Sequence, residues 1–287
     1  MPFEMPTREV VEAANQKSRR LKALLQAPEI VIMPGAFNVL SALLFQHLEF
    51  EAIQGSSAGF ANATGHPDLG VSRQRMVEMT RLCAQAVRIP VNADGEDGYG
   101  GPDDVRETIR GFIDAGAAGM NMEDGDRQSP GKLLDIKFQL EKIAAFMDER
   151  KTLGSEFLLN ARCDAFIALA NDRPAALKEA VKRGQAWAEA GADSVFFFRV
   201  AEPDFIKTLV KEVPAPVSIL AGPGIPSARE LEEWGVARVS YGSAFLQVAV
   251  AAVKKAAIEV RDHKTHELMA DGVRGQEMQD ILNGRVS

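Results

Sequence analysis

Short apolar runs alternate with longer amphipathic stretches along the chain. Eight of the runs have the length and composition of β-strands, and they begin near residues 29, 50, 89, 117, 156, 193, 216 and 236. The stretches between them repeat apolar residues three or four positions apart, as helices that bury one face do. Two of these stretches end at Gly116 and Gly191, where a helix C-terminus favours a left-handed residue, and a strand-like run follows each.

Eight strand–helix units in this order predict an α/β fold, a (β/α)8 barrel of the TIM type. The runs are apolar on both faces, as expected of parallel strands that helices cover. An open doubly wound sheet is the alternative, but the first run leads into MPGAFNVLSALL, which lacks a G-x-G-x-x-G turn. We therefore expect residues 1–287 to form a single barrel domain, with a lead-in helix in 1–28 and an amphipathic helical tail in 262–287.

The composition narrows the class of protein. The chain has 287 residues, 46% of them hydrophobic, and a formal net charge of −7, which argues against nucleic-acid binding because that needs a basic face. Cys83 and Cys163 are too few for a disulfide framework or a Cys-rich zinc site. No apolar stretch is long enough to span a bilayer, and MPFEMPTREVVEAANQ lacks a signal-peptide pattern. We expect a cytoplasmic protein with no membrane partner.

Polar side chains collect where the third, fourth and fifth expected strands end. In such a barrel the active site lies at that end, and strand alternation decides which residues share a face. The residues expected to face the barrel mouth are Asn92, Asp94, Glu96, Asn121, Glu123, Asn160, Arg162 and Asp164. Clustered carboxylates repel one another, so they need a metal, an internal ion-pair network or a solvated loop.

A divalent metal accounts well for the acids. Mg²⁺, with Mn²⁺ as an alternative, prefers oxygen ligands and keeps several waters. We expect it at Asp94, directly or through water, with Glu96 and Glu123 around it. Arg162, with Asn160 on the same face, would then hold the carboxylate of a small anionic substrate in a bidentate pair.

The segment GSSAGFANATGHPD follows the second expected strand. Backbone N–H groups of Ser57, Ala58 and Gly59 could bind an anion there. A tight loop of small residues is the equally plain interpretation. Asp68, at the end of the segment, could enter the barrel mouth.

Four segments together resemble the isocitrate lyase/phosphoenolpyruvate mutase superfamily. They are VNADGEDGYGG, GMNMEDG, LNARCDAF and EAGADSVFF, and the resemblance extends over residues 20–260. It implies a barrel whose eighth helix is exchanged between subunits, giving dimers of dimers. It also implies bound Mg²⁺ and a small 2-oxo or 2-hydroxy acid, whose C–C or P–C bond is made or broken through an enolate of the pyruvate type.

The resemblance also implies roles for residues at matching positions. The metal site would be formed by the acids Asp94, Glu96 and Glu123. The substrate contacts would come from Ser57, Ala58, Gly59 and Arg162, with Asp68 as an acid on the next turn.

Two departures separate this chain from the lyases of the superfamily. Glu96 and Asp97 stand where the usual motif has Asp and Thr. The gating loop Lys-Lys/Arg-Cys-Gly-His, whose Cys is the general acid, is replaced by the shorter EDGDRQSPGKLLD, which has neither Cys nor His. This argues against isocitrate and methylisocitrate lyase activity and indicates a short-loop subgroup. The proton would come from the loop, from Tyr99 or from water, and the candidate catalytic residues are Asp68, Glu96, Tyr99 and Arg162.

The leading expectation is a Mg²⁺-dependent carbon–carbon lyase for a small 2-oxo or 2-hydroxy acid. A phosphonomutase or phosphonopyruvate hydrolase is the alternative, and a non-catalytic ligand-binding relative is a third hypothesis. The apolar stretch SAFLQVAVAAVKKAAIEV from Ser243 predicts a helix with little polar face. Exchange of that helix between subunits would give a homodimer or homotetramer; alternatively, the tail from residue 262 covers it.

Overall fold

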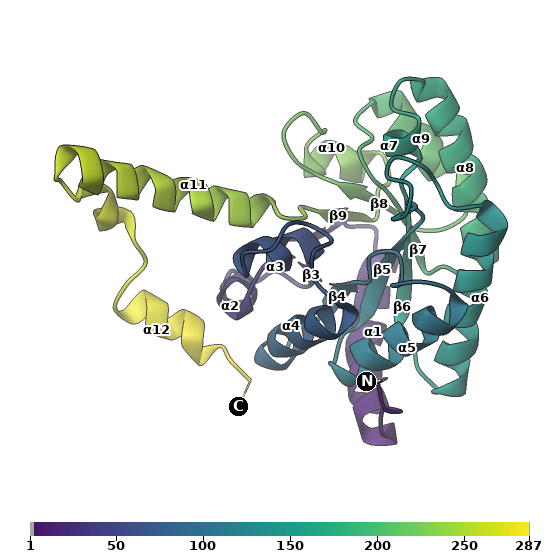
Figure 1. Cartoon of the computed structure of the whole chain (residues 1–287), viewed down its shortest axis with the longest axis horizontal. Helices are drawn as coiled ribbons and strands as arrows, with labels where there is room; N and C mark the ends of the chain where they lie inside the picture. The colour runs from purple at the N-terminus through teal and green to yellow at the C-terminus, as the bar shows by residue number, and fades with distance from the viewer. Residues whose placement is uncertain (1–2, 287) are drawn as a thin grey trace.

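The computed structural model describes residues 3–286 and confirms the barrel (Figure 1). All neighbouring strands are parallel. They are β1 (Val31–Met33), β2 (Gly35–Ala36), β3 (Ile53–Gly55), β4 (Val91–Asp94), β5 (Gly119–Glu123), β6 (Leu158–Cys163), β7 (Ser194–Phe197), β8 (Val217–Leu220) and β9 (Arg238–Ser240). Pairing runs from β2 through to β9, and β1 pairs with β9, so the sheet closes except between β1 and β2.

The first expected strand is divided in two, so the sheet has nine strands instead of eight. Pro34 separates β1 from β2 and has no N–H to donate, although its carbonyl oxygen accepts a hydrogen bond from Gln54 N at 3.0 Å. The two short strands together occupy one position in the barrel. Gly35 is required here because a Cβ on it would lie 1.7 Å from the carbonyl oxygen of Gly242.

Helices that follow the strands form the outer layer (Figure 1). They are α2 (Val39–His47), α3 (Ser57–Ala63), α4 (Arg73–Ala86), α5 (Pro102–Asp114), α6 (Ile136–Thr152), α7 (Ala165–Ala168), α8 (Arg173–Glu189), α9 (Pro203–Glu212) and α10 (Ala228–Glu233). Their buried faces and the outward faces of the strands form one continuous apolar core.

The expected lead-in helix, α1 (Arg8–Gln26), lies across the N-terminal end of the barrel. Its Leu21 and Leu25 are buried in an apolar cluster with Val31 and Leu158, which begin β1 and β6. Because α1 closes this end, the end where the strands finish is the one left for a site.

The inside of the barrel carries a polar layer. The side-chain amide of Asn92 donates to Gln54 at 2.9 Å and to Asn121 at 2.9 Å. The amide of Asn160 donates to Asn121 at 2.8 Å, and its carbonyl oxygen accepts from Ser194 Oγ at 2.6 Å. Buried amides are stable when hydrogen-bonded in this way, so the layer forms a fixed floor below the barrel mouth.

Helix α11 (Ala244–Ile258) leaves the barrel and projects as an arm (Figure 1). The chain continues through a π-helix (259–263), a 3-10 helix (267–271) and α12 (Gln276–Asn283). No residue of α11 is buried, and Val248 and Val253 are 68% and 69% exposed. Within residues 3–286 the tail touches α11 only with its 3-10 helix and leaves the helix exposed, because α12 packs on α2, where Gln46 Nε2 donates to the Gly284 carbonyl oxygen at 2.8 Å. The alternative in which the tail from residue 262 covers α11 is therefore wrong.

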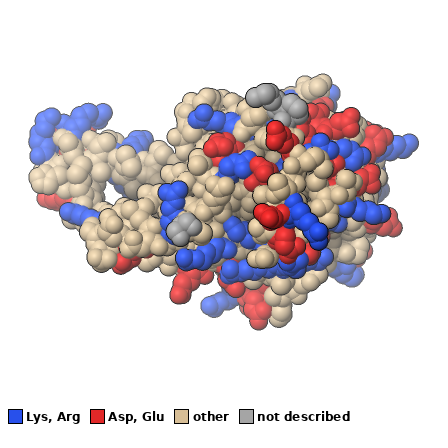
Figure 2. Space-filling view, turned by 90° about the horizontal axis from the view of Figure 1, so that it is seen from below, with Lys and Arg blue, Asp and Glu red and all other residues tan. Residues whose placement is uncertain are grey.

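The surface has charges of both signs. Figure 2 shows Lys and Arg mixed with Asp and Glu over the face of the barrel that it presents, and an arm that is mainly tan with Lys and Arg at its outer end. Within residues 3–286, every helix is too short or too polar to cross a membrane.

Candidate active site

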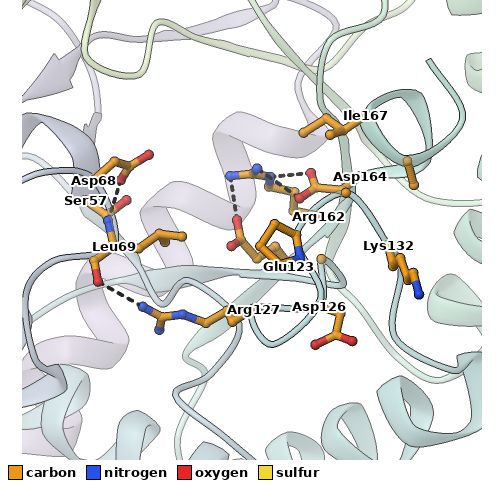
Figure 3. Close-up of a pocket in the computed structure, with 14 residues that line it drawn as sticks. Ser57, Asp68, Leu69, Glu123, Asp126, Arg127, Lys132, Arg162, Asp164 and Ile167 are labelled. Atoms are coloured by element: carbon orange, nitrogen blue, oxygen red, sulfur yellow. Dashed lines mark hydrogen bonds and ion pairs between the residues drawn. The ribbon is translucent and has the colours of Figure 1, made fainter. Parts of the chain in front are cut away.

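A cavity of about 220 Å³ opens at the C-terminal ends of β3, β5 and β6 (Figure 3). Its ionisable lining residues are Asp68, Glu123, Asp126, Arg127, Lys132, Arg162 and Asp164, and Ser57 adds a hydroxyl group. Figure 3 shows Ser57 and Asp68 on one side and Lys132 on the other, with Glu123 and Arg162 between them. The cavity has room for a compact acid, and charged groups of both signs surround it.

Asp94 ends β4 beside this cavity without lining it. Its Oδ2 accepts hydrogen bonds from Ser57 Oγ at 2.8 Å and from Ser57 N at 3.2 Å. Its Oδ1 accepts from Glu96 N at 3.2 Å. Ser57 therefore links the start of α3 to the acid, and the turn after β4 folds back onto the same carboxylate.

Glu96 is buried with its carboxylate unsatisfied. Its Oε2 lies 2.8 Å from Arg127 Nη1, but neither oxygen forms a hydrogen bond of good geometry with residues 3–286. Burial, and then the neighbouring Asp94, raise the pKa of this carboxyl to about 8, although Arg127 opposes the shift. A positive φ of 47° at Glu96 places the side chain here, a left-handed conformation that is uncommon outside glycine.

Arg162 joins the acids of two strands. The β5–β6 register sets Glu123 opposite Arg162, and Nη1 lies 2.6 Å from Glu123 Oε2. Nε and Nη2 donate to the two oxygens of Asp164 at 2.7 and 3.0 Å. The Phe198 ring stacks on the guanidinium, with its centroid 3.9 Å from Cζ. Burial raises the pKa of Glu123, and Arg162 opposes the shift.

The residues present fit a magnesium ion whose coordination is completed by water. No three His, Cys, Asp or Glu side chains among residues 3–286 already converge as a ligand set. Mg²⁺ needs only one or two carboxylates, because it keeps much of its water. The two buried oxygens of Glu96 without a hydrogen bond, next to Asp94, are oxygen donors of the kind that such an ion would engage directly or through water.

The first half of the small-residue segment is a helix, and turns follow from residue 64. Helix α3 begins at Ser57, and the N-cap Ser56 accepts a hydrogen bond from Gly59 N at 3.0 Å. Since Asp94 accepts from Ser57 N, two of the three N–H groups expected to bind an anion already have partners. Ala58 and Gly59 do not line the cavity, so only Ser57 reaches it.

Two further expected residues lie outside the cavity. Asn160 belongs to the polar floor, where its side chain is 2% exposed and hydrogen-bonded, so it supports the site without lining it. The Tyr99 hydroxyl is buried without a hydrogen bond to residues 3–286, and Tyr99 lines a neighbouring cavity of about 510 Å³. Arg127 lines both cavities and stands between them. Asp68 does line the main cavity, from an exposed turn.

The sequence interpretation missed three charged residues. Arg127 is in the short loop, and its position four residues after Glu123 was the available signal. Asp124 and Arg183 form a buried ion pair at 2.8 Å, and Asp124 Oδ1 also accepts from Asp164 N at 2.8 Å. Burial raises the pKa of Asp124 to about 6. Nothing local marks Arg183, which occupies an ordinary position in an amphipathic helix.

Comparisons with known proteins agree with this geometry. The family model for phosphoenolpyruvate phosphomutase matches residues 21–261. A Corynebacterium glutamicum protein named "Probable 2-methylisocitrate lyase 2" is 31% identical over 255 residues, covering 85% of this chain and 80% of that protein. Phosphonopyruvate hydrolase of Variovorax sp. (strain Pal2) is 30% identical over 257 residues, covering 85% of this chain and 87% of that protein.

A solved structure extends the agreement to three dimensions. It is a phosphonopyruvate hydrolase in complex with oxalate and Mg²⁺, and it superposes with a TM-score of 0.82 at 30% identity. The superposition covers 93% of this chain and 95% of the other. The sequence match and the superposition both include the barrel and the strand ends that form the cavity. The chain therefore belongs to the phosphoenolpyruvate phosphomutase family.

Proposed function

We propose that this chain is a Mg²⁺-dependent enzyme of the lyase type that makes or breaks a C–C bond in a small 2-oxo or 2-hydroxy acid through an enolate. The observation that carries the proposal is the small cavity in which Arg162 and Glu123 meet at 2.6 Å, next to Asp94 and Glu96. One confined space thus offers a cation for a substrate carboxylate and acid oxygens for a metal. The bound oxalate and Mg²⁺ of the related hydrolase support the same combination.

Arg162 binds the substrate carboxylate in this proposal. Its contacts with Asp164 and Glu123 leave one N–H on each Nη atom for a ligand. Stacking on Phe198 and pairing with Asp164 hold the guanidinium plane before the substrate arrives. This preorganisation lowers the entropy lost on binding.

Asp94, Glu96 and Glu123 hold the metal, directly or through water. When bound, the ion supplies a Lewis acid for the oxyanion of the enolate. Ser57 fixes one oxygen of Asp94, which orients the other side of that carboxylate. We assign proton transfer to the short loop or to water, because Asp126 and Lys132 line the cavity whereas Tyr99 does not.

Chemistry at a P–C bond is the second candidate. The family model and the related phosphonopyruvate hydrolases favour it, because their names describe reactions of phosphorus-containing pyruvate derivatives. Phosphorus NMR on phosphonopyruvate with Mg²⁺ separates the two reactions, because only P–C cleavage or migration moves the phosphorus signal.

A panel of 2-oxo and 2-hydroxy acids with Mg²⁺ tests the main proposal. We expect turnover of at least one acid by the parent and none by Asp94→Ala. Binding without turnover across the panel would indicate a non-catalytic relative. If no acid of the panel binds and none is turned over, the proposed substrate class is excluded.

We also propose that α11 is exchanged between subunits of a dimer or tetramer. Phe245, in its first turn, packs on Phe45 of its own chain with ring centroids 4.9 Å apart. Farther along, Val248, Val250 and Val253 are mostly exposed. A symmetric exchange would bury these three side chains in both copies at once.

A further inference from the structure

A second and larger groove opens beside the candidate active site. It has a volume of about 800 Å³ and shares Gly131, Lys132 and Ala168 with the smaller cavity. The short loop forms one wall, and helix α8 forms the other. Figure 3 shows Lys132 on the side of the cavity away from Ser57 and Asp68, so the groove begins where the acid cluster ends.

The groove differs from the cavity in chemistry. Leu133, Leu169 and Ala175 are half-buried along it, and they present only methyl and methylene groups. Gly131 lines both spaces, and nothing lies within 4 Å of the position that a Cβ on it would take, so their shared edge is not crowded there. An aliphatic chain suits such a surface, since it brings no polar group that needs a partner.

The rim of the groove is positively charged. Lys132, Lys178 and Lys182 are exposed around it, and Glu179 is the one acid among its lining residues. Glu179 is already engaged, with Arg183 Nε donating to it at 2.7 Å and Lys182 Nζ 3.7 Å away. Lys132 and Lys178 take part in no ion pair within 4.0 Å among residues 3–286. The rim therefore has two uncompensated cations.

We propose that the substrate is a 2-oxo or 2-hydroxy acid with an aliphatic chain that ends in a second anionic group. This inference rests on the proposed function and specifies its substrate class. The acid end lies at Arg162, the chain passes Gly131 onto Leu133 and Leu169, and the distal anion lies near Lys178.

A series of 2-hydroxy acids tests the inference by calorimetry on the full chain with Mg²⁺. The dicarboxylates malate, 2-hydroxyadipate and 2-hydroxysuberate are compared with 2-hydroxybutyrate, 2-hydroxyhexanoate and 2-hydroxyoctanoate. We expect affinity to rise about twofold to fourfold for each methylene that enters the groove. Each long dicarboxylate should bind up to about fivefold tighter than the monoacid of equal length, as exposed ion pairs allow.

Two variants assign the effect to the groove. Lys178→Ala should lower the ratio of the affinity for 2-hydroxysuberate to that for 2-hydroxyoctanoate, because it removes a cation of the rim. Ala175→Phe should fill the floor of the groove and so lower the ratio of the affinity for 2-hydroxysuberate to that for malate. Lys22→Ala, an exposed lysine on α1, is the matched control and should keep both ratios. If malate binds but the affinity does not rise with chain length, this inference is wrong and the proposed function still stands. If malate fails to bind as well, the proposed function falls, and the inference falls with it.

Discussion

Arg183 Nη1 and Asp124 Oδ2 lie 2.8 Å apart in a pair whose side chains are 6% and 0% exposed. The pair connects helix α8 to the end of β5. Arg183 Nη2 also donates to the Leu134 carbonyl oxygen at 3.0 Å, and Asp124 accepts from Asp164 N. The Arg183 guanidinium thus holds the end of the short loop. Through Asp124 it also fixes the backbone of Asp164, the acid that orients Arg162.

Replacing Arg183 with Gln leaves Asp124 buried without its cation. We expect the free energy of unfolding to fall by about 3 kcal/mol, because breaking a buried pair leaves an uncompensated charge. Urea unfolding measures this loss. Arg19→Gln is the control, because Arg19 and its two partners at 2.6 Å, Glu12 and Glu156, are all at least 45% exposed. The control should lose much less and keep its activity; equal losses in the two variants would contradict the prediction.

Asp94→Ala should abolish Mg²⁺ binding. The reason is that Asp94 is the acid held toward the cluster by Ser57, while Glu96 and Glu123 are too strongly buried to replace it. Titration calorimetry with Mg²⁺ alone measures the change. Asp103→Ala serves as the control, since Asp103 is fully exposed on α5. An unchanged Mg²⁺ affinity in Asp94→Ala would remove Asp94 from the metal site.

Arg162→Lys should raise KM for the substrate acid by tenfold or more, because losing one partner of a buried charged pair costs about 2–5 kcal/mol. Lysine keeps the charge but loses the planar fork that contacts Asp164 and Glu123 together. Steady-state kinetics with the acid found by the panel measures KM, and circular dichroism checks that the variant is folded. A folded variant with the parent's KM would show that Arg162 does not bind the substrate.

Light scattering at micromolar concentration should give a mass of two or four chains. The physical reason is that Val248, Val250 and Val253 of α11 stay exposed in the structure of residues 3–286. Val253→Asp should shift the mass toward one chain, whereas Leu82→Asp, at an exposed position on α4, should not. A monomer at every concentration of the parent would rule out the exchanged helix.

Glu202→Gln should show a pH-dependent loss of stability. Arg173 Nε and Nη2 donate to Glu202 at 2.7 Å each, and this hydrogen bonding lowers the pKa of Glu202 from 4.5 to about 2. A lowered pKa stabilises the fold above 4.5, and the gain is lost as the pH falls toward 2. With Glu202 38% exposed, we expect a loss of about 1 kcal/mol at neutral pH. Urea unfolding at several pH values checks this, and a loss that does not shrink in acid would contradict it.

The sequence by itself determined the barrel and the place of the acid cluster. Apolar periodicity and helix-ending glycines are local signals, so the strand–helix order could be predicted without knowing any distant contact. Alternation within strands then placed Asp94, Glu123 and Arg162 at the ends of neighbouring strands, and the parallel register brings Glu123 opposite Arg162. The division of the first strand at Pro34 and the short helix that begins at Ser57 were not predicted in this way.

The tertiary structure alone decided which of these residues meet in the cavity. Asn160 became part of the floor because serines of two later strands donate to it, and Arg183 reached Asp124 across 59 positions of the chain. Beyond Phe245, which packs on Phe45, the apolar residues of α11 stay exposed within residues 3–286, and the helix projects as an arm. Each outcome depends on contacts between residues far apart in sequence, which local propensity and spacing do not encode.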